Sequence, residues 1–188
     1  MAYIDTMTGL GNRTAFLEEN KSNAIFPGMI SYIMMDSNNR ETINDTLGHN
    51  KGDELIITIA KCMRKAVGHN GQCYRIGGDE FVIILKNKTA AETEEIINKV
   101  RCEIEFADKQ SDITISVAIG YVWTDTEQKN LEDLMQHADD EMYQDKKKTK
   151  ENKSKFDELI EDVESANAGA DVVILGLKSD LQKLERLQ

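Results

Sequence analysis

The 188-residue chain has few proline, cysteine or aromatic residues. Its single proline, Pro27, excludes a proline-rich linker. Its three cysteines form no closely spaced pair, and no histidine lies at zinc-ligand spacing from such a pair, so a disulfide framework and a zinc site are both disfavoured. This cysteine usage indicates a reduced, cytoplasmic chain. Aromatic residues make up only 6%, which argues against a base-stacking platform for nucleic acid.

Long apolar runs and targeting signals are also lacking. The first residues contain neither a basic segment nor an apolar one, so they do not form a signal peptide. The longest strongly apolar runs, Met29–Met35 and Val172–Leu177, are far shorter than the ~20 residues that a membrane-spanning helix needs. The sequence therefore predicts a soluble chain without membrane contact, or a soluble part of a larger protein.

Acidic residues outnumber basic ones, 34 to 23, which gives a net charge of −11. An acidic surface repels polyphosphates, so non-specific binding to a nucleic-acid polymer is excluded. An anionic ligand would need a local basic cluster or a metal ion. The hydrophobic fraction of 40% is large enough for a folded core.

The hydrophobic periodicity predicts the order helix, strand, helix pair, hairpin, helix, strand, helix. This mixture of a hairpin and crossover helices is typical of an α+β domain whose single sheet is covered by helices. The predicted elements are helices over Thr14–Asn20, Asp53–Val67, Thr89–Phe106 (with a Thr89/Glu92 capping box) and Leu131–Lys148, and strands over Met29–Met35, Cys73–Ile76, Phe81–Leu85 and Ile113–Trp123.

The charge-rich stretch Lys146–Lys155 suggests a boundary, with a domain over residues 1–150 and a helical extension over 151–188. The extension ends in five residues, four of them apolar, that alternate spacings of three and four, a short coiled-coil-like seam. Either a packing helix or a dimerisation helix fits this pattern. The seam consists of Ile174, Leu177, Leu181, Leu184 and Gln188.

The most informative turn is Gly77-Gly78-Asp79-Glu80, between two apolar strands. Its two glycines permit positive φ angles and the close approach of a ligand. A second carboxylate, Asp36, ends the apolar run 29–35, and strand ends are where such domains place ligands. Asp36 and Asp79 together suggest a Mg²⁺ site, because Mg²⁺ is held by one or two carboxylates plus substrate phosphates.

Two further pairs of residues suit a guanine nucleotide. Asn44 and Asp53 flank a glycine-containing turn, and a carboxylate with an amide can read the hydrogen-bonding edge of guanine. Both residues are equally typical of turns and helix N-caps. Lys146 and Lys150 lie one helical turn apart and could bind phosphates, although a solvated basic face has the same pattern.

Residues 77–81 read GGDEF, and the chain resembles the GGDEF family, the diguanylate cyclases. Three other motifs of that family occur in the same order and spacing. They are D-T-M-T-G-L-G-N-R from Asp5, N-D-x-x-G-H-x-x-G-D from Asn44, and A-D-x-x-M-Y-x-x-K from Ala138. The resemblance covers about residues 1–150 and leaves 151–188 outside.

The resemblance implies an α+β fold, ferredoxin-like and related to the palm of nucleotide cyclases, with a central, mostly antiparallel sheet flanked by helices. It implies that two GTP are condensed to cyclic di-GMP and two pyrophosphates across a homodimer of half-sites. It also implies a Mg²⁺ cofactor, with Mn²⁺ as the alternative ion, and is compatible with an upstream sensor domain in a parent protein. The implied residues are Asp36, Ser37 and Asp79 for the metal, Asp79 and Glu80 for catalysis, and Asn44, Asp53, Lys146, Lys150 and Arg40 for substrate binding.

The chain departs from the family pattern in two places. After Asp36 the family has an apolar residue and a phosphate-facing lysine where this chain has Arg40 and Glu41. Glu41 would weaken GTP binding unless Arg40 takes over the contact or Glu41 points away. The family's inhibitory product site has R-x-x-D where this chain has Gly68 and Gly71, so we expect no product inhibition there.

Two other functions remain as alternatives. The first is a degenerate GGDEF domain that binds GTP and regulates a partner without turnover. The second is a purely structural dimerisation module, which only the C-terminal seam favours.

Overall fold

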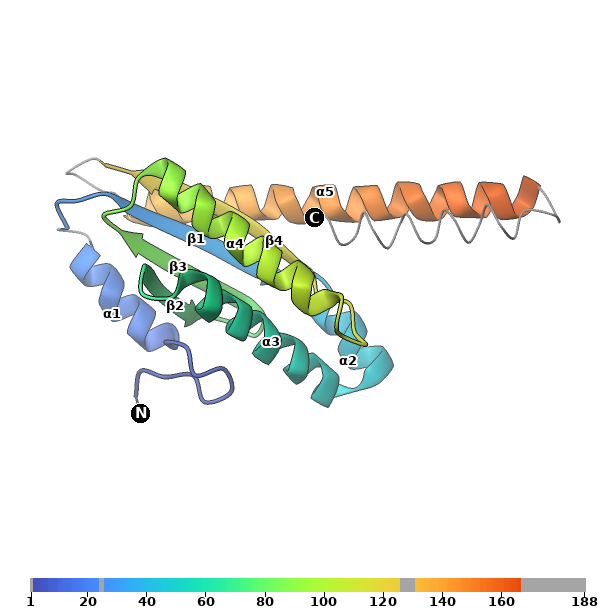
Figure 1. Ribbon diagram of the computed structural model, residues 1–188, viewed down its shortest axis with the longest axis horizontal. Helices are drawn as coiled ribbons and strands as arrows, with labels where there is room; N and C mark the ends of the chain where they lie inside the picture. Colours follow the sequence, from blue (N-terminus) through green and yellow to red (C-terminus); the bar gives the residue numbers. More distant parts are fainter. Residues whose placement is uncertain (1, 24–25, 126–130, 167–188) are drawn as a thin grey trace.

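The computed structural model describes residues 2–23, 26–125 and 131–166. Its elements follow the predicted order of helices and strands (Figure 1). They are α1 (Arg13–Asn23), β1 (Ile30–Ser37), α2 (Arg40–Leu47), α3 (His49–Val67), β2 (Gly71–Arg75), β3 (Glu80–Lys86), α4 (Ala90–Asp108), β4 (Val117–Thr124) and α5 (Leu131–Ala166).

The four strands form one sheet in the order β2-β3-β1-β4. Each neighbouring pair is antiparallel, and β1 occupies an inner position between β3 and β4. This confirms the α+β class and the antiparallel sheet expected from the resemblance.

Both faces of the sheet are covered, and this explains the uninterrupted apolar run in β1. Successive side chains of a strand point to opposite faces. Ile33 and Met35 therefore join the cluster that α3 and α4 cover, while Tyr32 and Met34 join a second cluster with residues of α1 and α5. A strand that is buried on both faces has no solvent-facing side chains. Its sequence is therefore continuously apolar instead of alternating between apolar and polar residues.

Several element boundaries differ from the prediction. The β-rich run begins as a strand only at Val117, although Ile113 and Ile115 before it are buried. Helix α3 begins at His49 rather than Asp53. The Thr89/Glu92 capping box of α4 is confirmed, with both reciprocal hydrogen bonds present.

Helix α5 continues without interruption through the charge-rich stretch that suggested a boundary, and it projects beyond the sheet (Figure 1). The apolar seam predicted between Ile174 and Gln188 lies outside the described residues. Within the described ranges, no helix is both long enough and apolar enough to cross a bilayer.

Helix α5 packs unusually closely on β4. A Cβ atom added to Gly120 of β4 would lie 2.1 Å from the Met142 nitrogen and 2.2 Å from the Ala138 oxygen, both backbone atoms of α5. Ala138 is fully buried there. This contact fixes the height of α5 over the sheet, and it lies one helical turn before Lys146.

Candidate active site

The pairing of β1 with β3 brings the Asp36 carboxylate next to the GGDEF turn. Asp36 is the register partner of Glu80 across this ladder. One residue further on, the backbone N–H of Ser37 donates a hydrogen bond to the carbonyl of Asp79 at 3.2 Å. Residues 36–37 and 79–80, more than forty positions apart in sequence, therefore form one cluster at the end of two neighbouring strands.

Helix α5 adds a cation to this cluster. The Nζ of Lys146 lies 2.5 Å from Oδ1 of Asp36, and the Asp36 side chain is only 13% exposed. Lys150, one turn later, also acts electrostatically on Asp36. The structure thus brings Lys146 and Lys150 to the carboxylate at the end of β1, where Lys146 contacts Asp36. That these lysines bind phosphates stays a prediction.

Burial and the negative charges of neighbouring carboxylates make ionisation of the acidic side chains in this cluster less favourable. Burial raises the pKa of Asp36, and the charge of Asp79 adds to this effect, although hydrogen bonding to Lys146 opposes it. Burial likewise raises the pKa of Glu80, as do the charges of Asp36, Asp79 and Asp139. Raised carboxyl pKa values in a cluster of like charges are typical of sites that accept a cation or a proton.

The two glycines of the turn serve close packing rather than positive φ. Among the described residues, the glycines with positive φ are Gly9, Gly48 and Gly68, so Gly77 and Gly78 do not use the positive φ angles that glycine permits. A Cβ on Gly77 would lie 2.2 Å from Oε2 of Glu80, and one on Gly78 would lie 2.6 Å from Nη1 of Arg40. The missing side chains therefore make room for a carboxylate and a guanidinium.

The loop from β1 into α2 offers unsatisfied polar groups. Asn39, the N-cap residue of α2, makes no capping hydrogen bond with its side chain. Within the described residues, the buried side-chain polar atoms without a hydrogen-bond partner are Oγ of Ser37, Oδ1 of Asn38 and Nε of Arg40. All three belong to this one loop, and Glu41 beside them is exposed to solvent.

The candidate guanine-binding residues lie on α2 and α3. A Cβ on Gly52 would lie only 1.9 Å from Oδ1 of Asn44, so the Asn44 side chain lies over Gly52, directly beside Asp53. Asn44 and Asp53 are both half-buried. Since α3 begins four residues earlier, Asp53 is not the N-cap residue that the alternative interpretation required.

The oxygen donors at the strand ends fit a Mg²⁺ ion. In the described part of the chain, no three His, Cys, Asp or Glu side chains gather in a metal-binding group. Mg²⁺ does not need such a group, because it is usually held by one or two carboxylates together with waters and substrate phosphates. Asp36 and Asp79, both partly buried, would supply the hard carboxylate ligands, and the Ser37 carbonyl would be a further oxygen.

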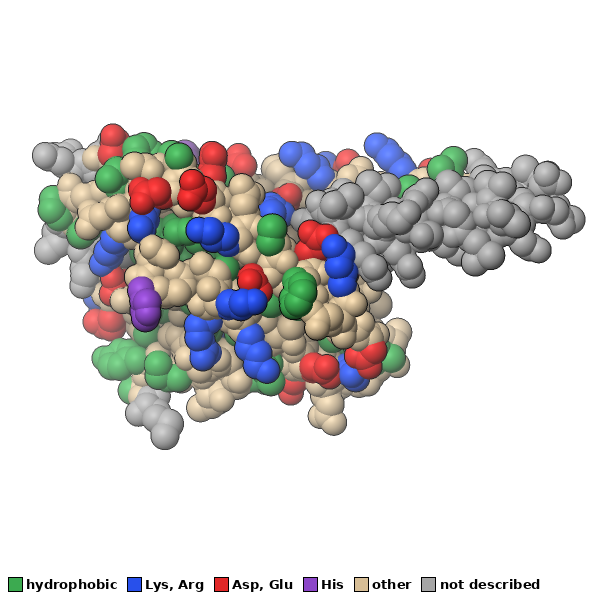
Figure 2. Space-filling view, viewed as in Figure 1, with side chains coloured by type: hydrophobic (Ala, Val, Ile, Leu, Met, Phe, Trp, Pro, Cys, Tyr) green, Lys and Arg blue, Asp and Glu red, His purple; other side chains and the backbone are tan. Residues whose placement is uncertain are grey.

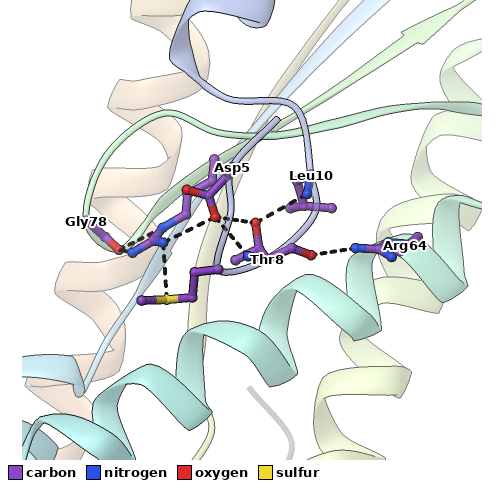
Figure 3. Close-up of polar contacts among 7 residues, drawn as sticks. Asp5, Thr8, Leu10, Arg64 and Gly78 are labelled. Atoms are coloured by element: carbon purple, nitrogen blue, oxygen red, sulfur yellow. Dashed lines mark hydrogen bonds and ion pairs between the residues drawn. The ribbon is translucent and has the colours of Figure 1, made fainter. Parts of the chain in front are cut away.

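Sequence reasoning missed a hydrogen-bond network that connects the GGDEF turn to the N-terminal residues of the chain (Figure 3). The Arg75 side chain, 10% exposed, donates to the Gly78 carbonyl through Nη2 at 2.7 Å and Nε at 3.2 Å. Its Nη1 lies 3.3 Å from Oδ1 of Asp5. The same Asp5 oxygen accepts from the backbone N–H and the hydroxyl of Thr8, at 2.9 Å and 2.7 Å.

This network connects the first motif of the chain, which begins at Asp5, to the GGDEF turn. Arg64 of α3 anchors it from the other side by donating to the Thr8 carbonyl at 2.5 Å. Burial disfavours ionised Asp5, but its bonds from Thr8 and Arg75 outweigh this and hold its pKa below the ordinary value. The motif that contains Asp5 and Thr8 is visible in the sequence. That Arg75 is the partner of Asp5 could not be identified without the fold.

The positions equivalent to the family's inhibitory site line a cavity of about 600 Å³. Gly68 and Gly71 form part of its wall, next to Arg64. Glycines offer no charged group for a phosphate, so the absence of product inhibition at this place stays a prediction.

Comparisons with known proteins agree with this geometry. The family model described as "Diguanylate cyclase, GGDEF domain" matches residues 2–152. "Signaling protein YkoW" of Bacillus subtilis (strain 168) is 33% identical over 165 residues, which are 83% of this chain and 20% of that protein. "Diguanylate cyclase DgcN" of Escherichia coli (strain K12) is 32% identical over 150 residues, which are 76% of this chain and 36% of that protein. The chain thus spans less than two fifths of the length of these two relatives.

Solved structures show the same fold. The GGDEF domain of DgcB from Caulobacter crescentus, in complex with c-di-GMP, superimposes with a TM-score of 0.69 at 24% identity, covering 78% of this chain and 91% of that one. The FimX GGDEF domain from Pseudomonas aeruginosa gives a TM-score of 0.71 at 20% identity, covering 79% and 96%. With a family model matched over most of its length, the chain belongs to the GGDEF domain family of diguanylate cyclases.

Proposed function

We propose that this domain condenses two molecules of GTP to cyclic di-GMP with release of two pyrophosphates. The observation that carries the proposal is the cluster of Asp36, Asp79 and Lys146 at the paired ends of β1 and β3. Membership of the family and the names of several relatives, such as DgcN, support cyclic di-GMP synthesis in general.

Binding of GTP combines base recognition with charge neutralisation. The Asp53 carboxylate accepts hydrogen bonds from guanine N1–H and the exocyclic amine, and the Asn44 amide donates to O6. Lys146 and Lys150 neutralise phosphate charge, and Arg40 is a further phosphate contact. Asp36, Asp79 and the Ser37 carbonyl would hold Mg²⁺, or Mn²⁺ in its place, which when bound supplies charge neutralisation at the phosphates.

In the proposed reaction, two subunits with GTP bound face each other as a homodimer. Glu80 takes the proton of a 3′-hydroxyl, a function that its raised pKa supports. The 3′-oxygen then forms a bond to the α-phosphorus of the opposite nucleotide, and the bond from that phosphorus to pyrophosphate breaks. Phosphoryl transfer depends chiefly on in-line positioning and charge neutralisation, which two facing half-sites supply.

The experiment that tests this proposal is incubation of the purified protein with GTP and Mg²⁺, with cyclic di-GMP measured by chromatography and mass spectrometry. We expect product from the unsubstituted protein and a loss of about a hundredfold or more in Asp79→Asn, because one of two metal carboxylates is neutralised. Asp157→Asn, on the exposed projecting part of α5, is the matched control and should retain turnover. Absence of product in the unsubstituted protein would contradict cyclase activity.

A second candidate function is GTP binding without turnover, in which the domain regulates a partner. It is favoured by Glu41, which stands where the family has a phosphate-facing lysine. GTP bound without product in the same experiment would support it. We also propose a cytoplasmic location, which the three free cysteines support.

A further inference from the structure

We infer that the Arg40 guanidinium binds the phosphates beyond the α-phosphate, replacing the cation that this chain lacks at position 41. This inference rests on the proposed function and identifies one further substrate contact. It concerns the β1–α2 loop and the turn that carries Asp79.

The position of Arg40 places its guanidinium at the candidate site. Arg40 is the first residue of α2 and follows Asp36 by four positions. Its Nη1 lies so close to Gly78 that a Cβ there would come within 2.6 Å. The guanidinium therefore lies against the turn that immediately precedes Asp79. An apolar side chain at position 40 would contribute no charge at this place.

The hydrogen-bonding state of the loop indicates a missing acceptor. Nε of Arg40 is buried and has no hydrogen-bond partner. Buried donors are nearly always paired in folded proteins, and an unpaired one is accounted for by strain, a water, an ion or a functional role such as ligand binding. A phosphate oxygen would satisfy this donor, and a guanidinium suits phosphate because it presents parallel N–H groups to two oxygens.

Arg40 adds a cation on the α2 side of the site, whereas Lys146 and Lys150 come from α5. Lys146 is engaged with Asp36 in an ion pair. Three acidic side chains, those of Asp36, Asp79 and Asp139, act electrostatically on Glu80 in the same cluster. A polyphosphate entering this acidic site needs a cation on the α2 side, where Glu41 is exposed and carries the wrong sign.

The experiment compares the affinities of two nucleotides that have the same base but different numbers of phosphate groups. The probes are GMP and a GTP analogue with a methylene group between the α- and β-phosphorus atoms, which cannot release pyrophosphate. Dissociation constants are measured with Mg²⁺ for the unsubstituted protein, Arg40→Met and Lys61→Met. Lys61 is an exposed cation of α3 away from the turn and serves as the matched control.

We expect Arg40→Met to weaken the analogue about 10- to 100-fold, the usual effect of losing a hydrogen bond to a charged group, and to change GMP affinity less than threefold. Lys61→Met should change neither affinity. Thermal unfolding of Arg40→Met in the absence of nucleotide checks that the domain remains folded.

The outcomes separate this inference from the proposed function. Unchanged affinity for the analogue in Arg40→Met, or equal losses for the analogue and GMP, would overturn the inference and leave the proposed function standing. If the unsubstituted protein binds neither nucleotide, both are overturned.

Discussion

At the scale of single residues, Asp5 shows how a charge distant in sequence can hold the GGDEF turn in place. Asp5 accepts two hydrogen bonds from Thr8 and forms an ion pair with Arg75 (Figure 3). Arg75 in turn donates hydrogen bonds to the Gly78 carbonyl. The Asp5 side chain is 23% exposed and Arg75 only 10%, so solvent screens this pair less than the exposed ion pairs of the molecule.

We expect Asp5→Asn to lower the free energy of unfolding at pH 7 by about 1–3 kcal/mol, the range for a hydrogen-bonded charged group. The pKa of Asp5 is held below its ordinary value of 3.8. Its stabilisation is therefore present above that pH and is lost as the pH falls through the lower, folded-state pKa. Urea unfolding at pH 7 and near pH 3 measures this.

Asp112→Asn is the control for that measurement, because Asp112 forms an exposed ion pair with Lys51 and should matter little. A deficit in Asp5→Asn that is as large near pH 3 as at pH 7 would show that the charge of Asp5 is not its cause.

At the scale of elements, the register of α5 on β4 decides where the lysines of the site lie. The two elements approach so closely at Gly120 that backbone atoms of α5 occupy the space of a side chain. Lys146 follows Met142 by one helical turn, so the same contact sets the distance between Lys146 and Asp36. The packing of α5 at Gly120 of β4 thus determines the contact between Lys146 and Asp36 at the end of β1.

We expect Gly120→Ala to destabilise the domain by about 1–3 kcal/mol or more, since the new methyl group meets backbone that cannot rotate away. Thermal unfolding compares Gly120→Ala with the unsubstituted protein. An unchanged melting temperature in Gly120→Ala would show that the close packing of α5 on β4 is not limiting.

At the scale of the whole molecule, the net charge of −11 sets the conditions for binding a nucleotide. On the face shown in Figure 2, Lys and Arg side chains lie among Asp and Glu side chains rather than forming one large basic patch. The neutralisation of a triphosphate therefore has to be local, from Lys146, Lys150, Arg40 and a metal ion.

We expect binding of the methylene GTP analogue to weaken about tenfold or more when Mg²⁺ is removed with a chelator, because Asp36 and Asp79 then repel the phosphates. Guanosine, which carries no phosphate, should bind equally with and without the chelator. Equilibrium dialysis provides both values. Equal affinity for the analogue in the two conditions would contradict a metal-dependent site.

Much of the fold was predictable because its signals are local. The buried strand at residues 29–35 shows itself by an uninterrupted apolar run, and the Thr89/Glu92 capping box marks the start of α4 through residues three apart. Helix α2 and the true start of α3 were harder to predict, because a short polar helix has little hydrophobic pattern and Gly48 acts as a cap for both.

The sequence by itself determined the family motifs, the acidic charge balance and the residue types that suit a metal and a guanine nucleotide. Only the tertiary structure decided which of them meet. The pairing of β1 with β3 brings Asp36 to Glu80, the packing of α5 brings Lys146 across 110 positions to Asp36, and the turn places Gly78 against Arg40. The physical reason is that strand register and helix height are set by non-local packing, which no local pattern of residues encodes.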